Sequence, residues 1–321
     1  MDLRKREFKA TARNLLLSNG ILVAIIILII VTGIIQPEFF AWSNMVNIMR
    51  QVAVNGIIAC GMTVCIMSGC YDLSVGSIVS MTGVFAILAV NAGYNDIICI
   101  LIGLGIGLLA GVFNGSPIAA INGRGGEAFI ITYGTQTILA AIALFPSKGL
   151  FIAGRVNDGL FKMMGMNNAP IYIFLVVAVI LHFFISKTSF GRNLCFIGNN
   201  MDAAKMSGIR VKFNRITYYA ISGLLAGLAG IVLCSRVTSS NPTAGLNYEM
   251  NAIAAVVVGG NSASGGSGSI IRTVIGAVVI GIMGNALNIL GFSTNYQLIV
   301  KGLLIILAVT LDIVSKKANK H

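Results

Sequence analysis

Charged residues are scarce in this sequence. They make up 10% of the 321 residues, whereas 56% are hydrophobic; an ordinary soluble domain has about a quarter charged residues. Several apolar runs exceed the about 18 residues that a helix needs to cross a bilayer. The composition excludes a soluble domain and predicts an all-α integral membrane protein.

Motifs of catalysis and cofactor binding are missing as well. The chain contains no GxxxxGK[ST] phosphate loop, no GxSxG elbow and no HExxH zinc motif. Its histidines, His182 and the terminal His321, form neither a dyad nor a metal site, and its six cysteines include no CxxC pair. We therefore expect a non-enzyme that itself binds no metal and no cofactor.

Nine apolar runs are long enough to suggest membrane crossings. Residues 1–14 are a basic tail, which the positive-inside rule places in the cytoplasm. Nine crossings would put the equally basic tail 313–321 outside, so parity requires a tenth. The short apolar run 251–260, followed by the Gly/Ser-rich 261–269, is the candidate for a broken passage. The nine runs are 15–36, 48–69, 75–92, 97–121, 128–145, 170–187, 216–235, 270–290 and 297–312.

The net charge of +12 is explained by the two tails and one loop, 188–215, rather than by nucleic-acid binding. With about ten crossings, both termini and this loop are cytoplasmic, and 146–169 and 236–250 are the main external segments. The whole chain, 1–321, is then a single transmembrane domain in contact with membrane lipid.

Two sequence patterns concern helix packing. The pairs Gly107/Gly111 and Gly223/Gly227 have the spacing that lets membrane helices approach closely. A weak similarity between the stretches that begin at Ile102 and Ile275 hints at two related halves.

Few polar side chains lie within the apolar runs. Asp72 has two interpretations: it caps the helix that follows it, or it forms a polar path with Asn55 and Ser74. Lys301 either extends to the interface or pairs with Asp72 or Glu249 across the bundle.

The loop 188–215 contains the sequence MDAAKM, which we expect to form a short helix between Gly198 and Gly208. Composition alone leaves two interpretations open. The segment is a solvated basic connector, or its small-residue patch at Ala203 and Ala204 docks into a groove of a partner protein.

Several blocks of sequence, in a fixed order, resemble a known family. They are PEFFAWSNMVNIMRQ, DLSVGSIVSMTG, AFIITYGTQTIL, GNNMDAAKMSGI, PTAGLNYEMNAIAAVVVGG and NYQLIVKGLLIILAVTLD. The chain resembles the ribose-type permease subunits of bacterial ATP-binding-cassette importers, within the branched-chain amino acid and sugar permease superfamily. The resemblance covers nearly the whole chain.

The resemblance implies a multi-pass permease of the bacterial inner membrane with ten helices. Its implied partners are cytoplasmic ATPase subunits that bind ATP and magnesium, an external solute-binding protein, and a second permease copy or paralogue. It also implies that a short helix couples the chain to the ATPase, through residues that match the family's pattern: Asn200, Asp202, Ala203, Ala204 and Gly208.

The chain departs from the family pattern at Tyr71 and Asn251, among other positions, which leaves the solute open among pentoses, hexoses, polyols, nucleosides and sugar-like signals. We expect alternating access, with a pathway through Asn55, Asp72, Ser74 and Asn251. The alternatives are a secondary transporter driven by an ion gradient, which would need more ionisable groups within the membrane, and a membrane enzyme or scaffold.

Overall fold

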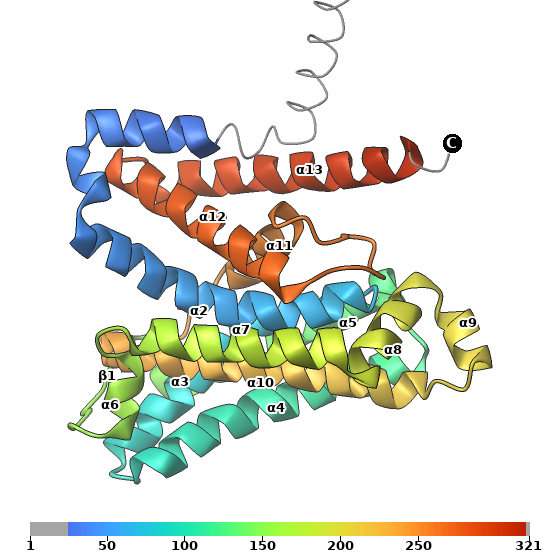
Figure 1. The fold of residues 1–321 in the computed structure, drawn as a ribbon. Helices are drawn as coiled ribbons and strands as arrows, with labels where there is room; N and C mark the ends of the chain where they lie inside the picture. The colour runs from blue at the N-terminus through green and yellow to red at the C-terminus, as the bar shows by residue number, and fades with distance from the viewer. Residues whose placement is uncertain (1–24, 319–321) are drawn as a thin grey trace, which may run out of the picture.

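The computed structural model describes residues 25–318, and the basic tail 1–14, the start of the first apolar run and the last three residues lie outside this range. The described chain is almost entirely helical. The short helix α9 lies at one end of the bundle, and β1 and α6 lie at the other (Figure 1). The elements are a helix over Ile25–Ile35, η1 Pro37–Phe40, α2 Trp42–Met67, α3 Val75–Asn91, α4 Asp96–Ala120, α5 Gly125–Ser147, β1 Ile152–Ala153, α6 Leu160–Gly165, α7 Ala169–Lys187, α8 Ser189–Asn199, α9 Met201–Met206, α10 Val211–Val237, β2 Ser239–Ser240, α11 Tyr248–Val258, α12 Ile270–Ile289 and α13 Thr294–Ala318.

Within the described residues, six helices are long and apolar enough to cross a membrane: α2, α4, α5, α7, α10 and α12. Four shorter apolar helices accompany them: Ile25–Ile35, α3, α11 and the Thr294–Leu307 part of α13. The fold class, an all-α membrane protein, is therefore as predicted.

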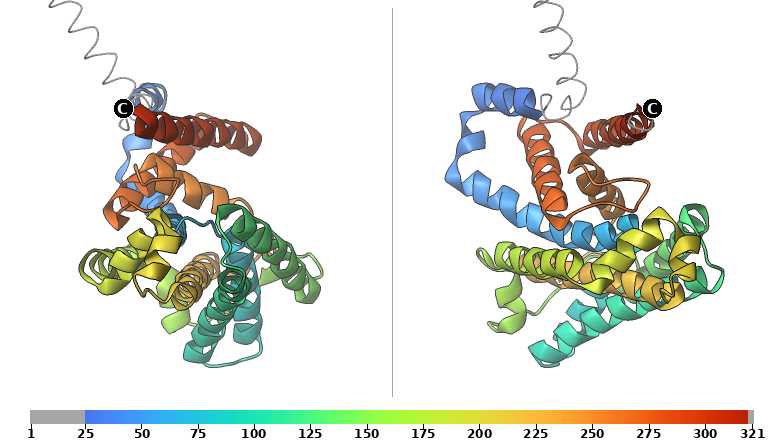
Figure 2. Two further views of the ribbon diagram at one scale, coloured as in Figure 1. Left: turned by 90° about the vertical axis from the view of Figure 1, so that its right-hand side faces the viewer. Right: turned by 45° about the vertical axis from the view of Figure 1, so that its right-hand side comes forward.

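Helix α2 is buried along most of its length and forms the centre of the bundle. A helix that is apolar on all sides is expected to be covered on all sides, and α2 contacts α7, α10, α11 and α12. Seen from the α9 end, α11–α13 lie on one side of the molecule, and α3–α5 lie on the other (Figure 2).

The predicted glycine seam joins α4 to α10. A Cβ atom on Gly107 would collide with the backbone of Gly223 and Gly227, and one on Gly111 would collide with the backbone of Tyr219. Because these positions have no side chain, the two backbones touch directly. The expectation that these glycines allow close helix packing is confirmed.

The run predicted to form a broken passage is a short helix followed by irregular backbone. Helix α11 ends at Val258, and Gly260 has a φ of +90°, which turns the chain out of the helix. Residues 259–269 return to α12 without regular structure, yet several of their polar groups are paired: Gly266 N donates to Met67 O at 2.9 Å, and Asn261 Oδ1 accepts from Ser269 N at 2.6 Å. Such backbone is tolerated at membrane depth only where protein surrounds it.

The two segments predicted to be external lie together. Strand β1 pairs antiparallel with β2, with Ile152 opposite Ser240 and Ala153 opposite Ser239. The side chain of Asn91, at the end of α3, supports this ladder: its Nδ2 donates to Ala153 O at 3.0 Å, and its Oδ1 accepts from Arg155 N at 2.8 Å.

The arrangement also agrees with two related halves. Ile102 and Ile275 are 173 positions apart (275 − 102), and Val75 and Tyr248, which begin α3 and α11, have the same separation. The contacts repeat in the same way: α10 packs on α3 and α4, whereas α2 packs on α11 and α12. The first long helix of each half therefore packs into the other half.

Candidate functional site

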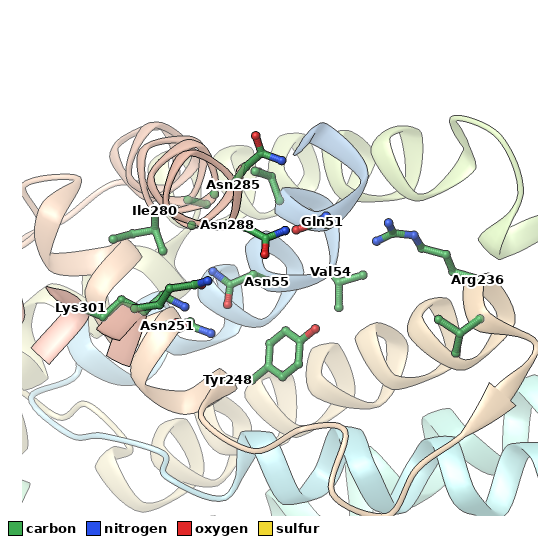
Figure 3. Close-up of a pocket in the computed structure, with 16 residues that line it drawn as sticks. Gln51, Val54, Asn55, Arg236, Tyr248, Asn251, Ile280, Asn285, Asn288 and Lys301 are labelled. Atoms are coloured by element: carbon green, nitrogen blue, oxygen red, sulfur yellow. The ribbon is translucent and has the colours of Figure 1, made fainter. Parts of the chain in front are cut away.

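A cavity of about 470 Å³ lies between α2, the end of α10, α11, α12 and α13. Figure 3 shows amide side chains entering it from α2 and α12, with the ring of Tyr248 below them. Primary amides dominate its polar lining. They are Gln51, Asn55, Asn251, Asn285, Asn288 and Gln297.

Helical spacing explains why these amides meet. Gln51 and Asn55 are four residues apart on α2, and Asn285 and Asn288 are three apart on α12, so each pair lies on one face of its helix. Asn55 is 9% exposed, and its Oδ1 has no hydrogen-bond partner among the described residues. Asn55 thus lines the cavity with an amide whose oxygen the surrounding side chains leave unpaired.

The charged groups of the cavity are both cationic. Arg236 and Lys301 line it, and no carboxylate is among its lining residues. Arg236 Nη2 is held by Asn47 Oδ1 at 3.0 Å. Since an amide donates and accepts, the lining can bind hydroxyl groups in either sense, whereas it has no anionic ligand for a metal cation.

The structure brings three of the residues singled out from the sequence into this cavity: Asn55, Asn251 and Lys301. The suggested pairing of Lys301 with Glu249 is not found, because no carboxylate lies within 4 Å of Lys301 among the described residues. Glu249 is two residues before Asn251, a rotation of about 200° around α11. Its Oε1 accepts from Gln136 Nε2 on α5 at 3.4 Å, away from the cavity.

Asp72 and Ser74 lie elsewhere, in a polar cluster between α3, α4 and α10. Asp72 is fully buried. Its Oδ1 accepts from Ser74 N at 3.1 Å, from Ser74 Oγ at 2.7 Å and from Asn114 Nδ2 at 3.3 Å, and its Oδ2 accepts from Ser222 Oγ at 2.9 Å. The carboxylate thus binds the amide of Ser74, which precedes α3, but no amide within the first turn of α3, so the capping interpretation is met only in part. It also connects the start of α3 to α4 and α10.

Tyr71, one of the departures from the family pattern, also points away from the cavity. Its hydroxyl donates to Ala263 O at 2.7 Å in the irregular segment 259–269, and its own carbonyl accepts from Tyr219 Oη at 2.9 Å. Of the two departures at issue for the solute, only Asn251 lines the amide-rich cavity.

The predicted short helix is present as α9, Met201–Met206. Asn200 caps it, because its Oδ1 accepts from Asp202 N at 3.1 Å and from Ala203 N at 3.0 Å. Ala204 lies on the buried face of the helix, whereas Ala203 lies on its exposed face. Gly208 follows with a φ of +79°, which favours glycine.

One detail of this segment differs from expectation. Gly198 is not in a flexible turn but inside α8, where a Cβ atom would collide with Met67 O. Asp202 Oδ2 forms an exposed ion pair with Arg124 Nη2 at 2.8 Å, which joins α9 to the α4–α5 loop.

Sequence reasoning missed most of the cavity. Gln51, Arg236, Tyr248, Asn288 and Gln297 line it without having been singled out. The sequence does contain a signal for these residues. Amides that recur at a spacing of three or four within an otherwise apolar helix form a polar stripe along it. In a membrane bundle such a stripe faces protein or water rather than lipid.

Comparison with known proteins agrees with this architecture. Residues 44–309 match the family described as branched-chain amino acid transport system / permease component. The ribose import permease protein of Bacillus subtilis (strain 168) is 41% identical over 299 residues, which cover 91% of this chain and 92% of the relative.

Two relatives named for other sugars are similar over comparable lengths. The D-allose transport system permease protein of Escherichia coli (strain K12) is 38% identical over 296 residues, with 89% and 88% of the two chains covered. The L-arabinose transport system permease protein of the same strain is 35% identical over 306 residues, with 94% and 92% covered. No solved structure matches the chain significantly. This multi-pass inner-membrane protein belongs to the branched-chain amino acid transport system permease family.

Proposed function

We propose that the chain is the permease subunit of an ATP-driven importer of a sugar or sugar-like solute, and that the amide-lined cavity is part of the solute path. The observation that carries the proposal is a lining of six amides without a carboxylate. It occurs in a chain 35–41% identical to permeases named for ribose, arabinose and allose.

Amides suit a sugar because each sugar hydroxyl both donates and accepts a hydrogen bond. Modest, reversible contacts are also what a transport path needs, since a tightly held solute would not leave. The rival function, transport driven by an ion gradient, requires ionisable groups that carry the coupling ion. The absence of carboxylates from the cavity lining argues against a cation-coupled path there.

The proposed topology has ten crossings, made by the six long and four shorter apolar helices, with α11 and the segment 259–269 together forming one of them. With the first crossing starting inside, both tails and the α9 end are cytoplasmic, and the β1–β2 ladder is external. The six cations of 187–215 support this orientation.

We propose that α9 seats in a cytoplasmic ATPase subunit, which is a separate chain and binds ATP and magnesium. The exposed surface of Asp202, Ala203 and Met206 forms the contact, and buried Ala204 anchors the helix to this chain. An external solute-binding protein delivers the solute, and a second permease copy or a paralogue completes the assembly. ATP-driven closure of the ATPase pair then moves the permease halves between outward and inward access.

The test measures uptake and assembly on the same variants. Asn55→Leu and Asn288→Leu should lower uptake of labelled pentoses and hexoses at least about tenfold, because each removes hydrogen bonds to the solute, while co-purification of the ATPase stays unchanged. Ala203→Arg should abolish co-purification. If uptake survives ATP depletion and collapses with the proton gradient, the importer proposal is wrong and the gradient-driven rival is correct.

A further inference from the structure

A second polar cavity, of about 380 Å³, lies at the α9 end of the bundle. It is formed where the end of α2, the α4–α5 loop, α8, α9 and the start of α10 meet the irregular segment 259–269. Its polar lining includes Ser68, Arg124, Asn199, Asp202, Arg215 and Ser264. Neither the family match nor the proposed solute path assigns it a role.

Arg215 is the unusual member of this lining. Its side chain is 3% exposed, and its Nε and Nη1 are buried with no hydrogen-bond partner among the described residues. No described carboxylate lies within 4 Å of it. The Glu127 carboxylate interacts with the charge of Arg215, but from beyond 4 Å. A buried cation without a carboxylate in contact is unfavourable, so Arg215 has room for a partner that the described side chains do not provide.

The other charges of the cavity leave it positive. Arg124 and Arg215 contribute two guanidinium groups, and Asp202 is the one carboxylate among the lining residues. That carboxylate is already engaged, by Arg124 Nη2 at 2.8 Å and by Lys205 Nζ at 3.8 Å. Nothing in the lining is therefore left to neutralise Arg215.

We propose that this cavity binds a phosphate-bearing anion, either inorganic phosphate or a phosphate monoester, with Arg215 and Arg124 as its donors. Guanidinium groups match phosphate oxygens with paired, charge-assisted hydrogen bonds. The volume is within the range of about 300–1,000 Å³ seen for small-molecule sites.

The position of the site gives the anion a regulatory effect. An anion at Arg124 opposes the pairing of the same guanidinium with Asp202 on α9, so binding the anion weakens this contact between α9 and the α4–α5 loop. By linkage, whatever weakens the Arg124–Asp202 pair strengthens anion binding. This reciprocity distinguishes a ligand site from two arginines that are merely structural.

The experiment titrates inorganic phosphate into the full-length chain, purified in a maltoside detergent that contains no phosphate, at constant ionic strength, with calorimetry as the readout. Arg215→Gln and Arg124→Gln should each weaken binding at least about tenfold, whereas Asp202→Asn should tighten it. Lys212→Gln and Arg210→Gln remove exposed cations near the site that do not line the cavity, and they should leave the affinity unchanged.

A parallel titration with ribose 5-phosphate separates the two sources of the phosphate group. Tighter binding than inorganic phosphate identifies an ester that uses the rest of the cavity, and equal binding identifies recognition of the phosphate group alone. If neither ligand binds, if Arg215→Gln binds as well as the native chain, or if Asp202→Asn binds more weakly, the proposal is wrong. Should Arg215→Gln fail to fold, the opposite effects of Arg124→Gln and Asp202→Asn still decide.

Discussion

Gly107 on α4 and Gly223 on α10 face each other so closely that the carbonyl oxygen of each occupies the place where a Cβ atom on the other would lie. The contact is backbone against backbone, and no rotamer change can relieve an added side chain. Dispersion contacts of this kind drive helix association in a membrane, where lipid is as apolar as leucine. The seam therefore holds the two halves of the fold together, since α4 and α10 belong to different halves.

Gly107→Val should destabilise the protein by more than the about 1–3 kcal/mol typical of overpacking in a core that can adjust, because the obstructing atoms are backbone. Gly105→Val is the matched control: Gly105 is on the same helix two residues away, and a Cβ atom there meets nothing within 4 Å. The measurement is the thermal unfolding midpoint in detergent. Equal unfolding midpoints for the two variants would contradict the conclusion that α4 and α10 pack backbone against backbone at Gly107.

Much of this seam could be predicted from the sequence, because helix packing in a membrane depends on the spacing of small residues along one helix. The same holds for α9: Asn200 before MDAAKM and Gly208 after it are local start and stop signals. Such features need only a few neighbouring residues.

The cavity and the Asp72 cluster could not be predicted in this way. Asn114 and Ser222, which bind Asp72, are 42 and 150 residues away from it along the chain. The spacing of Gln51 and Asn55 gives the polar face of α2 but not which helices converge on it. The suggested Lys301–Glu249 pair failed for a related reason, since the sequence did not tell which face of α11 carries Glu249 or which helix that face meets.

Asp72 should tolerate asparagine better than alanine. Asp72→Ala leaves Ser74 N and Ser222 Oγ without their buried acceptor, and each unsatisfied group costs about 1–3 kcal/mol. Asp72→Asn keeps one acceptor oxygen, and its NH₂ group can donate to Ser222 Oγ. The expected order of thermal stability is native, then Asp72→Asn, then Asp72→Ala.

The control for Asp72 is Asp158→Asn. Asp158 is bound to Lys162 at 2.7 Å, but its side chain is 92% exposed. Exposed ion pairs contribute little to folding, so this variant should unfold like the native protein. If Asp72→Ala is as stable as the native protein, the hydrogen bonds of the Asp72 cluster do not contribute to the stability of the fold.

Asn44 and Asn285 should be energetically coupled. Each amide nitrogen donates to the other's oxygen at 3.0 Å, which joins the start of α2 to α12 beside the cavity. Asn44→Ala and Asn285→Ala each leave a partner amide unpaired, so the double variant should lose less stability than the sum of the two single variants. Asn55→Ala is the control, because Asn55 Oδ1 has no hydrogen-bond partner to lose. If the stability losses of Asn44→Ala and Asn285→Ala simply add in the double variant, the two residues are not coupled.

Accessibility labelling should separate the two ends of the bundle. Ala153 on β1 is exposed at one end, and Met206 on α9 is 91% exposed at the other. In intact cells that lack the ATPase subunit, so that α9 is uncovered, a membrane-impermeant maleimide should modify Ala153→Cys but reach Met206→Cys only after permeabilisation, because the proposed ten crossings place β1 outside and α9 inside. Five of the six native cysteines are buried, so replacing the partly exposed Cys195 by serine removes most of the background. The reverse labelling pattern, or labelling of both positions from one side, would overturn the orientation and with it the assignment of α9 as the contact for an ATPase.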